Sequence, residues 1–135
     1  MGSSSVFVVG LMNLLYNVIG QKVKKKTLAQ KSIFFEQKIL KEVVGSQDQI
    51  AASYGGFNKI IFNKNNSISV KTISSKKNLK KLNENLILIY TGINRTAHKI
   101  ANQYVNKLTT VKKEHIDRIL TYVKEGEHIL RQGNV

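Results

Sequence analysis

The chain has 135 residues, of which 41% are hydrophobic and 22% are charged, and this composition is typical of one globular domain. It contains no cysteine, which excludes a disulfide scaffold, a thiolate nucleophile and a cysteine zinc site. The formal net charge of +14 suggests a nucleic-acid partner, but 19 of the 22 basic residues are lysines. Base readout and bidentate phosphate binding favour arginine, so we expect most of these lysines to be solvated. A basic module that binds RNA or DNA remains the alternative function.

The N-terminal segment predicts two helices. Residues 6–19 are mostly apolar on all sides of a helical wheel, follow a run of serines and precede Gly20, which predicts a buried helix with a serine cap and a glycine C-cap. The stretch is too short to span a bilayer, and no basic region precedes it as in a signal peptide, so a cytoplasmic location is the default expectation. Thr27 is expected to cap a second helix over residues 28–41.

The rest of the chain alternates short elements. Residues 43–49 are interpreted as a loop, residues 50–54 as a short helix that Gly55 and Gly56 end, and residues 74–83 as a polar, lysine-rich linker. The remaining predicted elements are a hairpin (57–62 and 68–73), a strand covered on both faces (86–90), and two helices (95–106 and 111–132). Helices, then strands, then helices indicate an α+β fold.

A possible anion site lies at the start of the first helix, which Gly2, Ser3, Ser4 and Ser5 open. The first-turn amides of a helix have no intrahelical partner and lie at the positive end of its dipole, so a small, flexible turn lets phosphate oxygens approach them. An ordinary serine cap or a tag remnant explains the same residues.

Two acidic residues are further candidates. Asp48 lies between Gln47 and Gln49, whose amides can hold a carboxylate in place as a base; alternatively, it caps the short helix. Glu36 is the one acid in the second predicted helix, where it either meets a partner such as Mg²⁺ or lies exposed on the surface.

A turn from a strand into a helix is a third candidate region. Asn94 and Arg95 follow the predicted strand and can face a ligand, although Asn94 also serves as a helix cap. The three histidines, His98, His115 and His128, show no spacing that fits a metal site.

The order and spacing of these segments resemble the GHMP small-molecule kinases, a superfamily that includes galactokinase and the homoserine and mevalonate kinases. Gly2-Ser3-Ser4-Ser5-Val6 before an apolar helix is similar to the second signature motif of that superfamily. Glu36, the stretch 45–58 with Gln-Asp-Gln before a double glycine, and the stretch 88–97 look like its sugar branch. The similarity is strongest to D-glycero-D-manno-heptose 7-phosphate kinases.

The resemblance implies an ATP-dependent sugar kinase that transfers the γ-phosphate to a sugar hydroxyl, in this branch the anomeric hydroxyl of heptose 7-phosphate. A galactokinase-like or fucokinase-like member is the alternative within the family. The amides of Gly2, Ser3, Ser4 and Ser5 would bind ATP, the Ser4 hydroxyl and Glu36 would hold Mg²⁺, and Asp48 would act as base or orienting carboxylate. The substrate contacts would come from Gln47, Gln49, Gly55, Gly56, Asn94 and Arg95.

The family pattern also predicts two incomplete lobes: an N-lobe like domain 2 of ribosomal protein S5 and a ferredoxin-like C-lobe. Residues 1–73 would be the C-terminal part of the ATP-binding lobe, 74–84 a linker and 85–135 the start of the C-terminal lobe. The first and third family motifs are not found in the sequence, so we expect an internal piece of a kinase with exposed apolar faces and little or no activity alone. Its partners would be ATP, a sugar phosphate, and either a complementing segment or a second copy.

Overall fold

A computed structural model describes residues 2–73, 75–93 and 112–134. The elements in chain order are α1 (Ser3–Val18), α2 (Lys25–Phe34), the π-helical turn η1 (Phe35–Ile39), α3 (Gln47–Tyr54), β1 (Asn58–Phe62), β2 (Ile68–Thr72), α4 (Lys76–Glu84) and α6 (Lys113–Gln132). They fall into two compact units. The first comprises Met1–Gly56 with Ile60–Val70, and the second comprises Phe57–Lys59 with Lys71–Val135.

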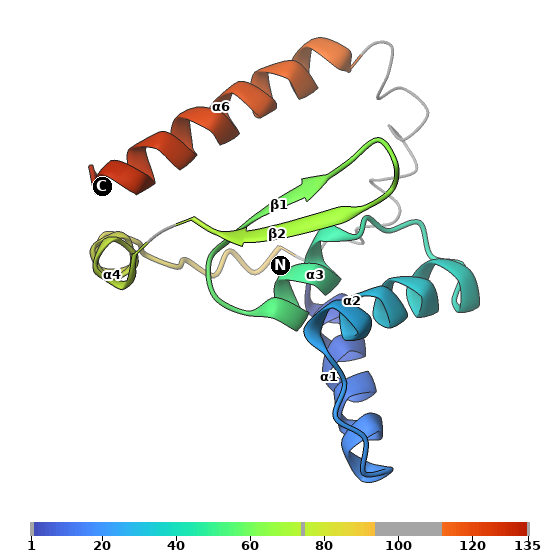
Figure 1. Ribbon diagram of the computed structural model, residues 1–135. Coiled ribbons are helices and arrows are strands. Elements are labelled where there is room, and N and C mark those ends of the chain that lie inside the picture. Colours follow the sequence, from blue (N-terminus) through green and yellow to red (C-terminus); the bar gives the residue numbers. More distant parts are fainter. Residues whose placement is uncertain (1, 74, 94–111, 135) are drawn as a thin grey trace. The chain divides into compact units, whose positions relative to one another are not determined.

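Three helices form the core of the first unit. α2 packs against α3, and α1 packs against both of them (Figure 1). The buried apolar side chains at their junction come from all three helices: Val8, Val9, Leu28, Ala29 and Ile50. Small and branched residues at these positions let the helices approach closely, which brings the N-terminal end of α1 next to α2 and α3.

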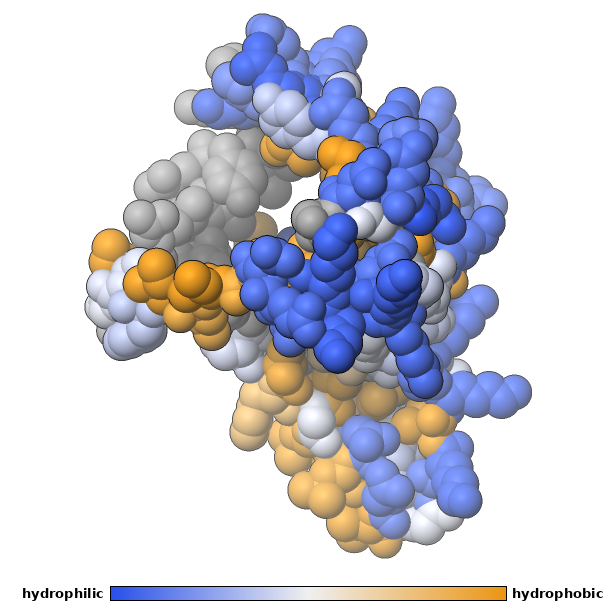
Figure 2. All heavy atoms as spheres, turned by 90° about the vertical axis from the view of Figure 1, so that its left-hand side faces the viewer, coloured by the Kyte–Doolittle hydropathy of each residue, from blue (hydrophilic) through white to orange (hydrophobic). Residues whose placement is uncertain are grey.

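Helix α1 confirms the predicted helix but not its predicted burial. Its buried residues, Ser5, Val8 and Val9, all lie in its first half. Figure 1 shows its second half extending away from α2 and α3, and Figure 2 shows apolar surface there. Gly20 ends the helix as expected: its φ of +71° turns the chain so that the Gln21 N–H donates to the Tyr16 carbonyl at 2.8 Å, beside the bond from the Gly20 N–H to the Asn17 carbonyl at 3.0 Å.

The predicted hairpin is confirmed as the two-stranded sheet β1–β2. Its turn is closed by side chains: the Asn63 amide donates to the Ser67 carbonyl at 3.1 Å, and the Asn65 side chain accepts from the Ser67 N–H at 3.1 Å. Asn66 adopts a left-handed φ of +60°, which asparagine tolerates better than most residues.

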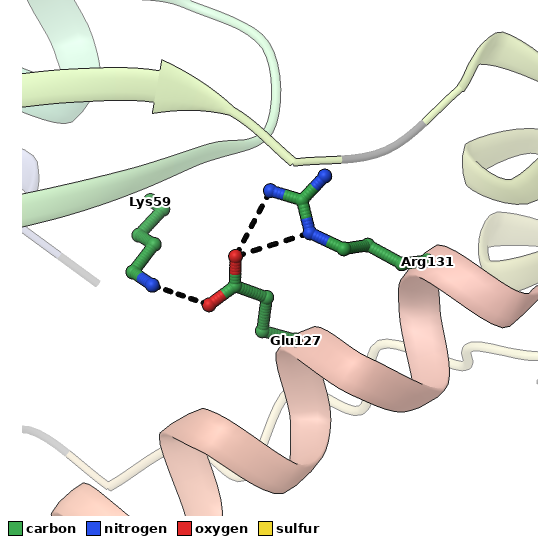
Figure 3. A network of polar contacts seen from close by, with 3 residues as sticks. All are labelled: Lys59, Glu127 and Arg131. Atoms are coloured by element: carbon green, nitrogen blue, oxygen red, sulfur yellow. Dashed lines mark hydrogen bonds and ion pairs between the residues drawn. The ribbon is translucent and has the colours of Figure 1, made fainter.

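In the second unit, α4 meets the C-terminal end of α6. The Asn78 amide donates to the Leu130 carbonyl at 2.8 Å, and Lys81 Nζ donates to the Gly133 carbonyl at 2.9 Å. These donors satisfy carbonyls that the end of a helix leaves without partners. Within the same unit, Glu127 of α6 binds Lys59 and Arg131 (Figure 3).

Four predicted element assignments were wrong, one of them the start of the short helix, which begins at Gln47 inside the predicted loop and not at residue 50. The second helix begins at Lys25, not after Thr27, and its N-cap residue is Lys24, so Thr27 is no cap. The linker contains helix α4, capped by the Ser75 hydroxyl, which accepts from the Asn78 N–H. The expected buried strand over residues 86–90 is neither a strand nor buried.

The last helix is confirmed over Lys113–Gln132. The expected helix over residues 95–106 lies outside the described residues. None of the described helices is long and apolar enough to cross a membrane.

Candidate active site

The N-terminus of α1 is built as an anion site requires. Gly2 is the N-cap with a left-handed φ of +60°, and its carbonyl accepts the first helical hydrogen bond from the Val6 N–H at 2.9 Å. The amides that precede Val6 in this turn therefore have no intrahelical acceptor. The first turn contains no acidic residue, so the helix dipole there is not offset from within α1.

Asp48 lies directly against this turn. A Cβ placed on Gly2 would be 2.7 Å from Asp48 Oδ2 and 2.8 Å from Asp48 Cγ, so only glycine fits at this position. Asp48 is half-buried and lies in the first turn of α3, which begins at Gln47. The proposed cap role for Asp48 is therefore wrong, since Ser46 is the N-cap residue of α3.

Glu36 lies in a fully buried polar network behind the same end of α1. Its Oε1 accepts from the Ser5 hydroxyl at 2.9 Å, and its Oε2 accepts from the Gln49 amide. The same Gln49 Nε2 lies 3.2 Å from Ser5 Oγ. Glu36 and Gln49 are 0% exposed and Ser5 is 4% exposed. One residue each from α1, η1 and α3 thus forms a closed hydrogen-bonded triangle.

Further buried polar atoms lie beside this network on α2 and α3. Ser32 and Ser53 are buried one helical turn from Glu36 and Gln49, respectively. Ser32 Oγ, Ser53 Oγ and Gln49 Oε1 make no hydrogen bond within the described residues. Buried oxygens of this kind are normally satisfied by an ordered water.

The local backbone helps to place Glu36. The carboxylate lies in the π-helical turn η1, which continues α2 and contains one extra residue per turn. Such turns rotate the side chains that follow them relative to a regular α-helix and are frequent at functional sites. Here the turn places Glu36 toward Ser5 and Gln49, and it leaves Phe34 54% exposed.

The structure brings only part of the predicted site together. Gly2, Ser5, Glu36, Asp48 and Gln49 converge, whereas the side chains or backbone of Ser3, Ser4, Gln47, Gly55 and Gly56 are exposed. Gly55 and Gly56 have φ values of +64° and +73° and end α3 as expected. Asn94 and Arg95 lie outside the described residues.

Glu36 is buried, so the surface interpretation was wrong. The hydroxyl that donates to Glu36 is that of Ser5, whereas Ser4, which is predicted to bind Mg²⁺, is exposed. Val8 and Val9 lie three and four residues after Ser5, and these three are the buried residues of α1. That spacing identifies Ser5 as the inward-facing serine.

The oxygen donors at this site suit Mg²⁺. Glu36 and the Ser5 hydroxyl are hard ligands, and Mg²⁺ is usually held by one or two carboxylates together with waters and substrate phosphates. Both oxygens of Glu36 already accept hydrogen bonds from neutral groups, the Ser5 hydroxyl and the Gln49 amide, so a cation here would share these donors' positions. Across residues 2–73, 75–93 and 112–134, no three His, Cys, Asp or Glu side chains gather into an all-protein metal site.

Comparisons with known proteins show what the chain is similar to. Residues 1–56 match the family model for the GHMP kinases N terminal domain, so this part of the chain belongs to the GHMP kinase family. The chain is also similar to D-glycero-alpha-D-manno-heptose 7-phosphate kinase from Campylobacter jejuni, with 30% identity over 109 residues. That alignment covers 80% of this chain and 32% of the relative, so the chain spans about a third of the relative's length. No solved structure gives a significant match.

Proposed function

We propose that the chain is part of an ATP-dependent sugar kinase that phosphorylates the anomeric hydroxyl of D-glycero-D-manno-heptose 7-phosphate. The name of the Campylobacter relative supports this substrate, and the GHMP match supports phosphoryl transfer. The observation that carries the proposal is the meeting of Asp48 and the α1 N-terminus at Gly2, with Glu36 hydrogen-bonded to Ser5 immediately behind. Residues 1–73 would then belong to the ATP-binding lobe and residues 85–135 to the C-terminal lobe.

The α1 turn would bind the phosphates of ATP. Amide N–H groups at a helix N-terminus hold phosphate oxygens without a charged side chain, and the dipole adds attraction. Glycine at position 2 lets both a phosphate oxygen and the Asp48 carboxylate approach the same backbone. Mg²⁺, held by Glu36 and a serine hydroxyl, would neutralise charge on the phosphates when bound.

Asp48 would act on the sugar. Its carboxylate would accept a hydrogen bond, and then the proton, from the attacking hydroxyl as the oxygen–phosphorus bond forms and the bond to the ADP oxygen breaks. Gln47, exposed beside it on α3, together with Gly55, Gly56, Asn94 and Arg95, would contact the sugar or its phosphate. Gln49 would support the substrate site from within the core and not touch the sugar directly, because its amide donates to Glu36 and Ser5.

A chimaera tests this function. The aligned segment of the Campylobacter enzyme is replaced by that of this chain, and ATP-dependent phosphate transfer to heptose 7-phosphate is measured. We expect Asp48→Asn to lower kcat by about 100-fold or more with a small change in KM, because it removes a group that acts in the transition state. Asp117→Asn on α6 is the matched control, since Asp117 is exposed and should leave kcat unchanged.

The substrate is tested separately. The same chimaera is supplied with heptose 7-phosphate, galactose and fucose in turn, and the kcat/KM values are compared. Preference for galactose or fucose would replace the heptose assignment while keeping the sugar-kinase class. Transfer that survives Asp48→Asn together with Ser5→Ala would reject the site itself.

A further inference from the structure

Gln49 lies in the first turn of α3, one residue after Asp48, and its side chain is fully buried. Its Nε2 donates to Glu36 Oε2 and lies 3.2 Å from Ser5 Oγ, its second acceptor. Because a carboxylate oxygen accepts hydrogen bonds, the amide nitrogen is the end of the side chain that faces Glu36. The side chain therefore connects α3 to α1 and to η1 at the same time.

The burial of Gln49 separates it from any bound substrate. Its side chain does not reach the surface of the described chain, and a segment packed on this surface would bury it further. Its amide nitrogen already has two acceptors, one on Ser5 and one on Glu36. Whatever Gln49 contributes to a reaction must therefore act through the groups that it holds in place.

The neighbouring Asp48 has little freedom where it meets α1. A Cβ on Gly2 would lie 2.7 Å from Asp48 Oδ2, so the carboxylate lies directly against the turn that opens α1. A side-chain atom lies about 6 Å from the axis of its helix, so a rotation of α3 by about 20° would move it by about 2 Å. Such a rotation would either press Asp48 into Gly2 or withdraw it from the turn.

The hydrogen bonds of Gln49 resist this rotation more sharply than the apolar contacts of α3 do. Ile50 is buried beside Gln49, but apolar contacts are non-directional and tolerate small shifts. Hydrogen bonds weaken steeply as their angles change. The two acceptors of Gln49 are also fixed relative to each other, because the Ser5 hydroxyl donates to Glu36 at 2.9 Å. Gln49 thus holds the first turn of α3 in one orientation against α1.

We propose that Gln49 is a positioning residue, which ties α3 to Ser5 and Glu36 and so sets where the Asp48 carboxylate stands against the turn that opens α1. This role rests on the proposed function, in which that turn binds phosphates and Asp48 accepts the proton of the sugar hydroxyl. A displacement of about 1 Å at a reacting group can lower a rate by about 100-fold. Loss of the Gln49 amide should therefore lower kcat through Asp48 and leave substrate binding nearly unchanged.

Steady-state kinetics of the chimaera described above test this role. Gln49→Met keeps the length of the side chain and removes its amide, and it should lower kcat by about 10- to 100-fold while each KM changes by less than about twofold. Added to Asp48→Asn, it should cause almost no further loss, because both substitutions remove the same contribution. Losses that multiply would show that Gln49 acts on the fold in general, and they would overturn the proposal.

A second variant and a control accompany this experiment. Gln49→Asn keeps a buried amide on a side chain too short to span both acceptors, and it replaces Gln49→Met in every comparison if the latter does not unfold cooperatively. Ser53→Ala is the matched control. Ser53 is buried one turn further along α3, and its hydroxyl makes no hydrogen bond within the described residues, so kcat should not change.

Urea unfolding of the separate chain gives a readout that needs no activity. Gly2→Ala should lower the urea midpoint, because its Cβ meets Asp48. In the Gln49→Met background α3 can turn away, so Gly2→Ala should lower the midpoint by about half as much, since the backbone strain remains but the clash is relieved. Equal shifts in the two backgrounds would overturn the proposal. A chimaera without phosphate transfer would count against the proposed function instead, and the urea comparison would then decide the placement of Asp48 by itself.

Discussion

At the scale of single residues, Gly2 provides the sharpest test of the site geometry. Gly2→Ala adds a Cβ at a left-handed φ of +60° and places it 2.7 Å from Asp48 Oδ2. We expect a loss of about 1–3 kcal/mol in unfolding free energy, because both the backbone strain and the clash must be relieved. Urea denaturation followed by circular dichroism measures this loss.

Gly10 is the matched control in the same helix. It lies inside α1, and a Cβ there would meet nothing within 4 Å. Gly10→Ala should therefore stabilise the chain by about 0.5–1 kcal/mol, since alanine restricts the unfolded chain and favours the helix. Equal effects of the two substitutions would show that Asp48 does not lie against Gly2.

The hydrogen bonds of Glu36 give a second prediction, which concerns the free energy of unfolding. Glu36→Ala leaves the Ser5 hydroxyl and the Gln49 amide without their acceptor in a fully buried position, which should cost about 2–4 kcal/mol. Glu36→Gln keeps the shape, accepts from Gln49 and can donate to Ser5 Oγ, so it should cost less than about 1 kcal/mol.

Thermal and urea unfolding of both Glu36 variants measure the difference. Glu42→Ala is the control, because Glu42 is exposed nearby and should change little. If Glu36→Gln destabilised the chain as much as Glu36→Ala, the charge of Glu36 and not its hydrogen bonds would hold the network.

The sequence predicts the chemistry of these residues better than their surroundings. Asp48 stands out in the sequence as an acid between two glutamine amides, and Glu36 as a lone acid that needs a partner; both lie at the α1 end. The burial of Glu36 could not be predicted, because it depends on the π-helical turn η1 and on Gln49 from another helix. Sequence spacing alone does not identify a turn with an extra residue, nor which of two adjacent glutamines faces inward.

At the scale of elements, one ion-pair network joins β1 to α6. Arg131 donates to Glu127 Oε1 at 3.1 Å from Nε and at 2.9 Å from Nη2, and Lys59 binds Oε2 (Figure 3). The hydrogen bond from Lys59 and then those from Arg131 lower the pKa of Glu127 below its ordinary value of 4.5. A carboxyl whose pKa is lowered by folding stabilises the fold when it is ionised.

This network predicts an acid-dependent loss of stability. The contribution of Glu127 is fully present above pH 4.5 and disappears as the pH falls through the lowered pKa. The stability difference between the wild type and Glu127→Gln should therefore be constant at neutral pH and shrink below pH 4.5. Urea titrations at pH 7, 5, 4 and 3 measure it.

Glu125→Gln is the control for this network, since Glu125 lies exposed on the same helix. Its effect should be small at each pH. A difference for Glu127→Gln that persists unchanged at pH 3 would show that shape, and not the ionised carboxylate, joins α6 to β1.

Elements with two independent local signals were predicted correctly, and those with one were not. The hairpin has an asparagine-rich turn and a second strand in which β-branched residues alternate, and α6 has a long helical periodicity; both were confirmed. The apolar run over residues 86–90 has no alternation to support it, and Ile87 and Tyr90 are 87% and 88% exposed. The polarity of residues 74–83 predicts a linker, although lysine and leucine are good helix formers and α4 occupies most of it.

At the scale of the whole chain, the positive charge is large but is absent from helix α1. The chain has 22 basic and 8 acidic residues, so most lysines have no acidic partner and repel one another in the folded state. The apolar face of α1, in contrast, carries no charge. The lysines therefore oppose compaction and non-specific association, while α1 remains free of that repulsion.

This balance predicts that sodium chloride stabilises the chain. Screening shortens the range of repulsion to about 8 Å at 0.15 M salt, so the melting temperature should rise by a few degrees between 20 and 300 mM NaCl. Lys22, Lys64 and Lys124 are exposed, and changing all three to Glu lowers the net charge by 6, from +14 to +8. That variant should melt higher than the wild type at 20 mM NaCl and respond less to added salt. A melting temperature that falls with salt in the wild type would instead indicate that ion pairs such as Lys59–Glu127 outweigh the net repulsion.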